Sequence, residues 1–135
     1  MFDVNKIKEQ VGFHIPAGDG QIKICNIKLK QNNLPELPKD YSDLLKMCNG
    51  FSNEDCAVFG AEITKHNRYK DIVAFNTTYF HQKPSEWLIL GENDFFYFIY
   101  NAKEKVYVLA DRDSLATEIS DTNFAPVLEA ILRIE

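Results

Sequence analysis

Residues 87–111 read WLILGENDFFYFIYNAKEKVYVLAD, and this stretch decides the fold. It holds three apolar runs, near 87–91, 94–100 and 105–110, which are separated by short polar breaks. Apolar runs of this length between turn-forming residues are typical of strands, and NAKEK is short enough to join the last two runs as a hairpin. The stretch therefore predicts a three-stranded antiparallel meander.

The middle run is apolar on both of its faces. One face would carry Phe95, Tyr97 and Ile99, and the other would carry Phe96, Phe98 and Tyr100. Side chains alternate between the two faces of a strand, so this strand must be covered on both faces or form a binding surface. The stretch contains no His, Cys, Ser or Thr. We therefore expect the sheet to be a scaffold rather than an active site.

Helical spacing of apolar residues predicts four helices, at 3–11, 39–48, 69–80 and 123–133. The second has the clearest apolar stripe and is followed by Asn49-Gly50, which favours a left-handed stop. The last contains Pro126, which fits only in a first helical turn. Its cap is therefore expected at Thr122 or Asn123.

Two other segments have strand-like patterns. QIKICNIKLK at 21–30 changes its apolar parity between Ile24 and Cys25, which suggests a bulge or a break into two pieces. CAVFG at 56–60 predicts a short strand, and PAGDG at 16–20 predicts a turn. The whole pattern predicts a single α+β domain over 1–135, with a mostly antiparallel sheet packed against several helices.

Composition limits the class of protein. The chain has 135 residues, of which 45% are hydrophobic, enough for a well-filled core. No apolar run approaches the roughly 20 residues of a membrane span, and the polar start MFDVNKIKEQ argues against a secretory signal. The three cysteines, Cys25, Cys48 and Cys56, are odd in number and lack CxxC spacing. They predict reduced, mostly packed thiols and a cytoplasmic chain without a membrane partner.

Charge is uneven along the chain. Residues 1–70 hold ten Lys/Arg and nine Asp/Glu, whereas residues 71–135 hold five against eleven, a net charge of −6. An acidic half repels phosphate backbones, so nucleic acid is not expected as a partner, and a basic protein is. The alternative is that the charge serves solubility alone.

The segment LPELPKDYSDLLKMCNG at 34–50 resembles the opening signature of the SUKH superfamily: a Leu-Pro entry, an aromatic residue, a Leu pair and Asn-Gly. WLILGEND at 87–94, followed by an aromatic strand and a second β-run, is similar to the Trp-to-Gly block of that superfamily. The likeness covers residues 34–132, with 1–33 as an N-terminal elaboration. The chain departs from the pattern at Phe51, where a further glycine is common, and at Asn93-Asp94-Phe95, which replaces a glycine-rich turn.

The resemblance implies an α+β domain without enzymatic activity. Many bacterial members of the superfamily are immunity proteins that bind and neutralise polymorphic toxins, often nucleases. Fungal members are regulatory interaction proteins. The resemblance therefore implies a protein partner rather than a substrate.

Metal-binding patterns are weak in this sequence. The Asp111-Arg112-Asp113 triplet has carboxylates two residues apart, which can converge on a hard cation. It lacks a glycine-rich calcium loop and a third positioned carboxylate, so we predict a solvated turn. His14, His66 and His81 lack the spacing of zinc ligands. We therefore predict no metal and no other cofactor.

Nucleophilic catalysis needs a nucleophile held against a base. Cys48 lies on the apolar stripe of a predicted helix, where burial keeps a thiol inert, and Cys56 has no neighbouring His. We therefore predict no catalytic residues and no enzymatic activity. A small hydrolase that uses Cys56 or the carboxylates of Asp111 and Asp113 is the alternative.

The predicted meander places acidic residues near its ends, and the predicted partner-binding residues are Glu92, Asp94, Tyr97, Tyr107, Asp111 and Asp113. In an antiparallel meander, the turn before one strand and the turn after the next lie at the same end. The acids would then form a negative rim beside exposed tyrosines, an arrangement common in protein interfaces. The alternative is that these tyrosines belong to the core, with their hydroxyl groups satisfied at its edge.

The leading functional hypothesis is a non-enzymatic immunity protein that binds a basic toxin domain. Reversing Glu92, Asp94, Asp111 and Asp113 to Lys should then weaken binding with little loss of stability. The alternative is a regulatory scaffold that binds peptides or its own copy through a free sheet edge. In either case, a monomer or a weak homodimer is expected.

Overall fold

The computed structural model describes residues 12–13, 16–52, 56–61, 71–79 and 86–132. In this part of the chain, seven strands form one sheet in chain order, and every neighbouring pair is antiparallel. The strands are β1 (Gly12–Phe13), β2 (Phe51–Ser52), β3 (Cys56–Val58), β4 (Trp87–Asn93), β5 (Phe96–Asn101), β6 (Val106–Asp111) and β7 (Thr117–Asp121). With several helices packed against this sheet, the predicted α+β class is confirmed.

The meander predicted from residues 87–111 is formed by β4, β5 and β6. Phe98 and Ile99 point to opposite faces of β5, and both are completely buried. The ring of Phe98 lies against the rings of Tyr41 and Tyr107. Of the two alternatives for the middle strand, cover on both faces or an exposed binding surface, the structure shows the first.

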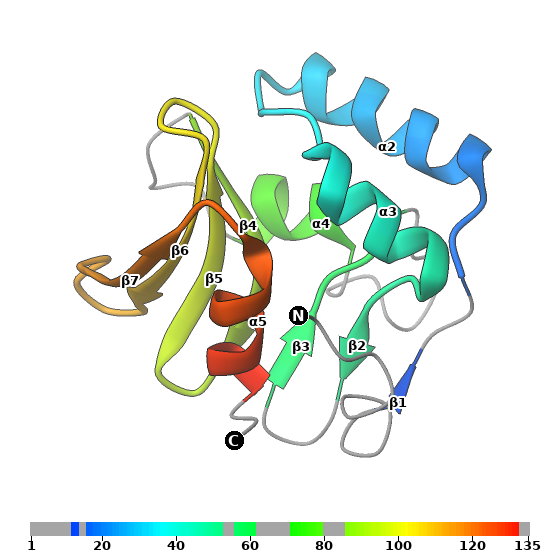
Figure 1. Cartoon of the computed structure of the whole chain (residues 1–135). Helices are drawn as coiled ribbons and strands as arrows, with labels where there is room; N and C mark the ends of the chain where they lie inside the picture. The colour runs from blue at the N-terminus through cyan, green and yellow to red at the C-terminus, as the bar shows by residue number, and fades with distance from the viewer. Residues whose placement is uncertain (1–11, 14–15, 53–55, 62–70, 80–85, 133–135) are drawn as a thin grey trace.

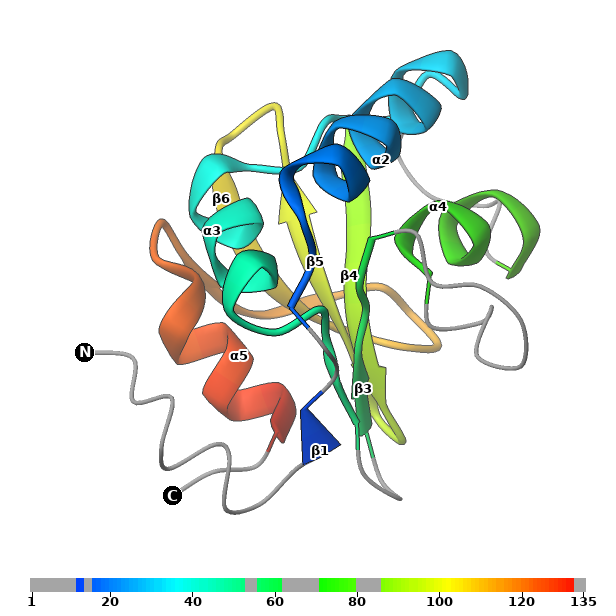
Figure 2. The ribbon, with the colours of Figure 1, turned by 90° about the vertical axis from the view of Figure 1, so that its right-hand side faces the viewer.

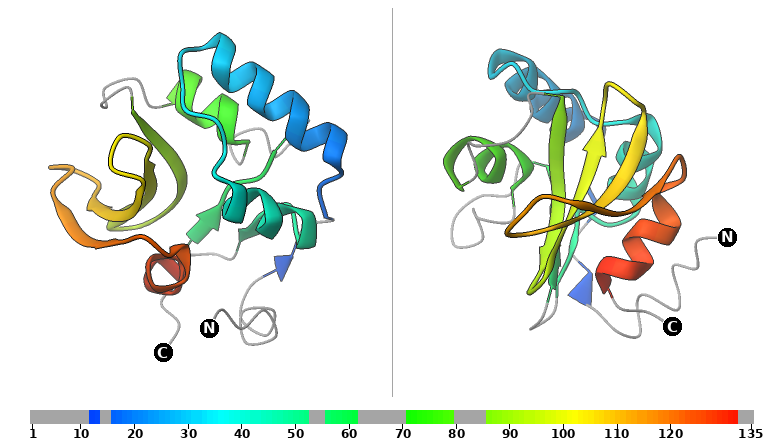
Figure 3. Two further views of the ribbon diagram at one scale, coloured as in Figure 1. Left: turned by 45° about the horizontal axis from the view of Figure 1, so that its top comes forward. Right: turned by 90° about the vertical axis from the view of Figure 1, so that its left-hand side faces the viewer.

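The helices described are α2 (Asp19–Gln31), α3 (Lys39–Met47), α4 (Ile72–Ala74), which continues into the π-helical turn η2 (Phe75–Tyr79), and α5 (Phe124–Leu132). Figure 1 places β5, β6 and β7 on one side of the molecule and α2 and α3 on the other. Figure 2 shows α2 at one end of the long strands, far from the β4–β5 turn at the other end. With the top of the molecule brought forward, β4 to β7 form a strongly curved part of the sheet (Figure 3).

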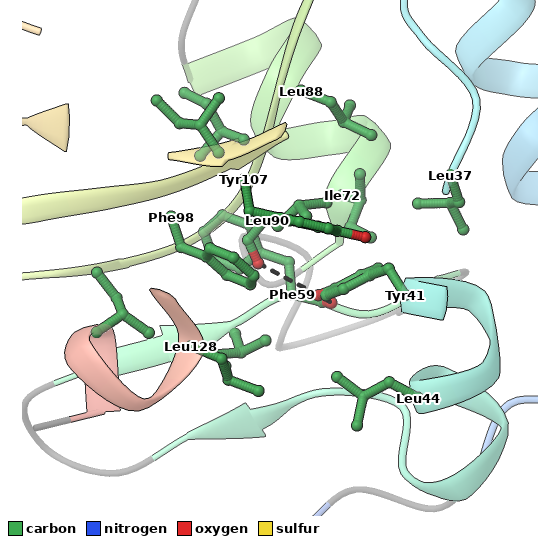
Figure 4. Packing of buried hydrophobic residues seen from close by; sticks show 14 of the residues in the cluster. Leu37, Tyr41, Leu44, Phe59, Ile72, Leu88, Leu90, Phe98, Tyr107 and Leu128 are labelled. Carbon is green, nitrogen blue, oxygen red and sulfur yellow. Dashed lines mark hydrogen bonds between the residues drawn. The ribbon is translucent and has the colours of Figure 1, made fainter. Parts of the chain in front are cut away.

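The core joins α3, β3 and the meander around two buried tyrosines (Figure 4). Tyr41 of α3 is fully buried, and its hydroxyl donates a hydrogen bond to the carbonyl oxygen of Phe59. Burial raises the pKa of Tyr41 well above its ordinary value, because the ionised phenol would be poorly solvated. Leu45 of α3 and Leu128 of α5 are also completely buried, as their predicted helix faces require.

The strand predicted at 21–30 is wrong, because these residues form most of helix α2. Ile22, Cys25 and Leu29 are buried at helical spacing, whereas Ile24 and Ile27 remain nearly half exposed. The apparent change of parity therefore reflects two apolar stripes on one helix. The start of the helix is fixed by Gln21, whose Oε1 accepts a hydrogen bond of 2.8 Å from the Gly18 N–H. The turn predicted at 16–20 is therefore wrong for its last two residues, because α2 begins at Asp19.

The edge of β4 extends beyond the end of β3, and a side chain takes the place of the missing strand. The Asn76 side-chain amide donates to the carbonyl oxygen of Ile89 at 2.9 Å and accepts from the Ile89 N–H at the same distance. An amide side chain has the donor and acceptor of a peptide group, so Asn76 continues the ladder. The helix predicted over 69–80 is confirmed for 72–79 as α4 and η2.

Gly50 adopts a φ of +99°, as the Asn-Gly signal predicts, although α3 already ends at Met47. A Cβ atom at Gly50 would lie 2.6 Å from the carbonyl oxygen of Val58, so β3 packs too closely for any side chain. The preceding Asn49 is buried, and its amide bonds both backbone groups of Ala61. The Asn-Gly pair therefore joins α3 to the segment after β3.

Strand β7 is absent from the sequence prediction, which places a turn and then the last helix after β6. Four of its five residues are exposed, and Ile119 is its one large apolar residue, so the sequence lacks a strand pattern. The closing helix is confirmed, and Asn123 caps it by accepting a hydrogen bond of 3.0 Å from the Ala125 N–H. The helix predicted at 3–11 lies outside the described residues.

Candidate protein-binding surface

The turns after β4 and β6 meet at one end of the sheet. Phe96 pairs with Asp111 across β5 and β6, and the backbone N–H of Arg112 donates to the carbonyl oxygen of Phe95 at 3.0 Å. This brings together the four predicted acids with an arginine and a phenylalanine. We call this surface the hairpin rim, formed by Glu92, Asp94, Phe95, Asp111, Arg112 and Asp113.

The exposed aromatic residue of the hairpin rim is Phe95, which is 60% exposed. Asn93 holds the backbone there, because its Oδ1 accepts hydrogen bonds of 2.8 Å from the N–H groups of both Phe95 and Phe96. The Phe95 ring meets that of Phe96 edge-on, with centroids 6.4 Å apart. The sequence pattern assigned Phe95 to a strand face, but it lies in the turn before β5. The Asn-Asp pair before it, a common turn signal, was the available clue.

Tyr97 does not lie exposed beside these acids, as the sequence suggested, but is buried with 7% exposure. The guanidinium of Arg112 lies over its ring, 5.2 Å from the centroid, which is a cation–π arrangement. The same guanidinium donates from Nη1 to the carbonyl oxygen of Asn93 at 2.7 Å. Burial raises the pKa of Tyr97, and the charge of Arg112 opposes that shift. Tyr97 therefore supports the hairpin rim from below.

Tyr107 does not belong to this surface, and its predicted role as an exposed anchor is wrong. It pairs with Tyr100 and Asp121 at the opposite end of the meander and is only 1% exposed. Its hydroxyl donates a short hydrogen bond to Oδ1 of Asp40. The ring also packs against Phe124 of α5. The alternative reading, a core tyrosine whose hydroxyl is satisfied at the edge, describes it correctly.

Asp111 acts as a turn residue. Its Oδ1 accepts hydrogen bonds of 2.9 Å from the N–H groups of Asp113 and Ser114, and these bonds lower its pKa because they stabilise the carboxylate. The turn predicted at 111–113 is therefore confirmed. Within the described ranges, no group of three or more His, Cys, Asp or Glu side chains could hold a metal ion.

Glu92 differs from the other acids because its carboxyl is partly buried. Burial raises its pKa, and the positive charge of Arg112 pulls in the opposite direction. Asp94 and Asp113 are exposed to solvent. The hairpin rim therefore offers two exposed carboxylates, Asp94 and Asp113, whereas Asp111 is bonded within its turn and Glu92 is partly buried.

The candidate nucleophiles offer little access to a substrate. Cys25, Cys48 and Cys56 are all buried, as packed cysteines should be. His14, His66 and His81 lie outside the described residues. No helix in the described part of the chain is long and apolar enough to cross a bilayer.

A scan of the chain against protein-family models finds no match, and a search of curated proteins finds none either. The SUKH resemblance of residues 34–50 and 87–94 therefore stays a prediction.

Proposed function

We propose that this chain is a non-enzymatic protein-binding domain whose hairpin rim binds a basic partner. The observation that carries the proposal is the exposed ring of Phe95 within a border of carboxylates. Aromatic side chains dominate the binding energy of many interfaces when a polar rim keeps water away from them. Phe95 is 60% exposed, so a large part of its ring is accessible to a partner.

Charge supports the choice of partner. Four carboxylates and one guanidinium give the hairpin rim a net charge of −3 when all are ionised. A surface of this sign speeds encounter with a basic protein and disfavours acidic ones. The side chains of Asn93 and Asp111 accept hydrogen bonds from backbone N–H groups and so hold both turns before binding. Little entropy is therefore lost when a partner docks.

The SUKH resemblance makes the partner more specific. An immunity protein must bind a toxin domain tightly, and a nuclease toxin presents a basic surface because it binds phosphate backbones. We therefore propose a stoichiometric immunity protein that covers such a surface. Its action would need no catalytic group, cofactor or metal of its own.

Co-expression with the product of the neighbouring toxin gene tests this function. We expect growth to be rescued, and the two chains to co-elute on a sizing column as one complex. Phe95→Ala should abolish rescue, whereas Met47→Ala, a change at a residue 53% exposed on α3, should not. Failure of the unaltered chain to rescue or to form a complex would refute the immunity role.

The exposed edge of the sheet supports a second candidate, a regulatory scaffold. β7 ends the seven-stranded order, and four of its five residues are exposed. Such an edge can accept an added strand, although the acidic Glu118 and the register shift between Leu109 and Ala110 make pairing less favourable. Light scattering across a concentration series distinguishes the two roles, since self-association through β7 would raise the apparent mass.

A further inference from the structure

A second concave surface lies along helix α2. Its volume is about 540 Å³, which is within the range of peptide and small-molecule sites. Its lining includes two isoleucines, three lysines and two acidic residues: Ile22, Ile27, Lys23, Lys30, Lys46, Asp19 and Glu36. We call it the α2 groove. Figures 1 and 2 both place α2 at the end of the molecule away from the β4–β5 turn, so the α2 groove is distinct from the hairpin rim.

The walls of the α2 groove are fixed by contacts between three segments. Oδ1 of Asn26 accepts a hydrogen bond of 2.8 Å from the Leu37 N–H, which ties the chain before α3 to α2. Lys46 of α3 lies 3.2 Å from Asp19 at the start of α2, measured from Nζ to Oδ1. A groove held in this way exists before a ligand arrives, and this lowers the entropy lost on binding.

Helix α2 carries a second apolar stripe that its own fold leaves exposed. Ile24 and Ile27 are three residues apart and are 45% and 47% exposed. Residues at this spacing share one face of a helix. Ile27, Lys23 and Lys30 line the groove, and Ile24 lies outside its lining on the same face of α2 as Ile27. Neither Lys23 nor Lys30 forms an ion pair with another residue that the structure describes. The surface therefore combines apolar contact area with positive charge.

We propose that the α2 groove binds an acidic amphipathic helix of a partner protein. Leu or Ile side chains spaced three and four apart on that helix would cover Ile24 and Ile27. Its Glu or Asp side chains would then meet Lys23 and Lys30. Helix-in-groove recognition uses this spacing of anchors, and opposite charges fix the register.

The shape of the α2 groove argues against a membrane surface as the ligand, because a concave surface beside a helix fits a rod better than a plane. The two isoleucines are only about half exposed, and the stripe contains no aromatic residue of the kind that anchors interfacial helices.

A labelled synthetic helix tests the proposal by fluorescence anisotropy at low salt. The probe is an acetylated and amidated peptide of about 15 residues, because shorter helices are marginal in water. It carries Leu at alternating spacings of three and four, with Glu on both flanks. We expect saturable binding that weakens about tenfold in the double variant Lys23→Glu/Lys30→Glu. Ile24→Gln/Ile27→Gln should weaken binding similarly, since Gln keeps the helix but removes the apolar stripe.

The matched control is Lys103→Glu/Lys105→Glu, which changes the net charge equally on the exposed turn after β5. It should change affinity less than twofold, and circular dichroism melts should show that all variants stay folded. The proposal is overturned if the acidic peptide does not bind, if its Glu→Lys counterpart binds equally well, or if the control weakens binding as much. Stronger binding to phosphatidylserine vesicles than to the peptide would also overturn it. None of these outcomes bears on the hairpin rim.

Discussion

The two ends of the meander use the same residue types in opposite ways. At one end, Tyr107 donates its hydroxyl to Asp40, and α5 contributes Phe124 against its ring, so an aromatic and an acid stabilise the fold. At the other end, Phe95 stays 60% exposed, and Asp94 and Asp113 face solvent. The comparison teaches that tertiary cover, rather than residue type, decides whether an aromatic–acidic pair belongs to the core or to a surface.

The largest expected effect belongs to the covered side of the sheet. Leu128→Ala should lower the free energy of unfolding by about 2–5 kcal/mol, because it leaves a cavity at a fully buried position. Phe95→Ala, at the open end, should change it by less than about 0.5 kcal/mol. Urea titrations measure both. Equal losses of unfolding free energy in the two variants would contradict the difference in burial between Leu128 and Phe95.

Tyr107→Phe should cost about 1 kcal/mol at neutral pH, because it removes the hydrogen bond to Asp40. Burial and the nearby Asp40 carboxylate raise the Tyr107 pKa above the ordinary 10.0. The unfolded chain therefore loses this proton first, and the stabilisation fades as the pH rises above about 10. Above about pH 10, urea titrations should therefore show a smaller difference in the free energy of unfolding between Tyr107→Phe and the unaltered chain. A difference that stays constant into the alkaline range would contradict the assignment.

Substitutions of the acids in the hairpin rim should differ in their effect on stability, according to the contacts that each carboxylate makes. Asp111→Ala should cost about 1 kcal/mol of stability because it removes the bonds to the Asp113 and Ser114 N–H groups. Asp94→Ala, the matched control, should cost less than about 0.5 kcal/mol at its exposed position. At Asp111 we therefore expect a larger loss of stability than the sequence predicts for reversal of the four acids. Thermal melts of the two variants decide this.

Asp94→Lys/Asp113→Lys should leave stability within about 0.5 kcal/mol and weaken partner binding. Salt screens the attraction between exposed charges. The Kd of the variant should therefore depend less on ionic strength than the Kd of the unaltered chain. Isothermal titration at several salt concentrations measures this, with Lys103→Glu as a control away from the surface. If the Kd of the variant and that of the unaltered chain depended equally on salt, the partner would bind at another surface.

The sequence predicted those parts of the fold whose pattern is local. The meander follows from three continuous apolar runs, and α3 and α5 follow from single apolar stripes. Helix α2 was not predicted, because its two apolar stripes, one buried and one exposed, also resemble the alternation of an interrupted strand. Strand β7 was not predicted, because a strand at the exposed edge of a sheet needs few apolar residues.

The candidate site was predictable only in part, because half of it depends on tertiary contacts. The acids of the hairpin rim could be brought together from strand order alone. Tyr107 could not be placed, because its partner Asp40 lies 67 residues away in the chain. Phe95 was missed as the exposed aromatic, because the alternation of the strand does not show where the turn ends.

The most direct test titrates the product of the neighbouring toxin gene with the unaltered chain and with Phe95→Ala. Because a central aromatic anchor contributes at least about 2 kcal/mol to binding, we expect the variant to lose about 30-fold or more in affinity while its melting temperature stays unchanged. An affinity for Phe95→Ala equal to that of the unaltered chain would contradict the proposed role of the hairpin rim.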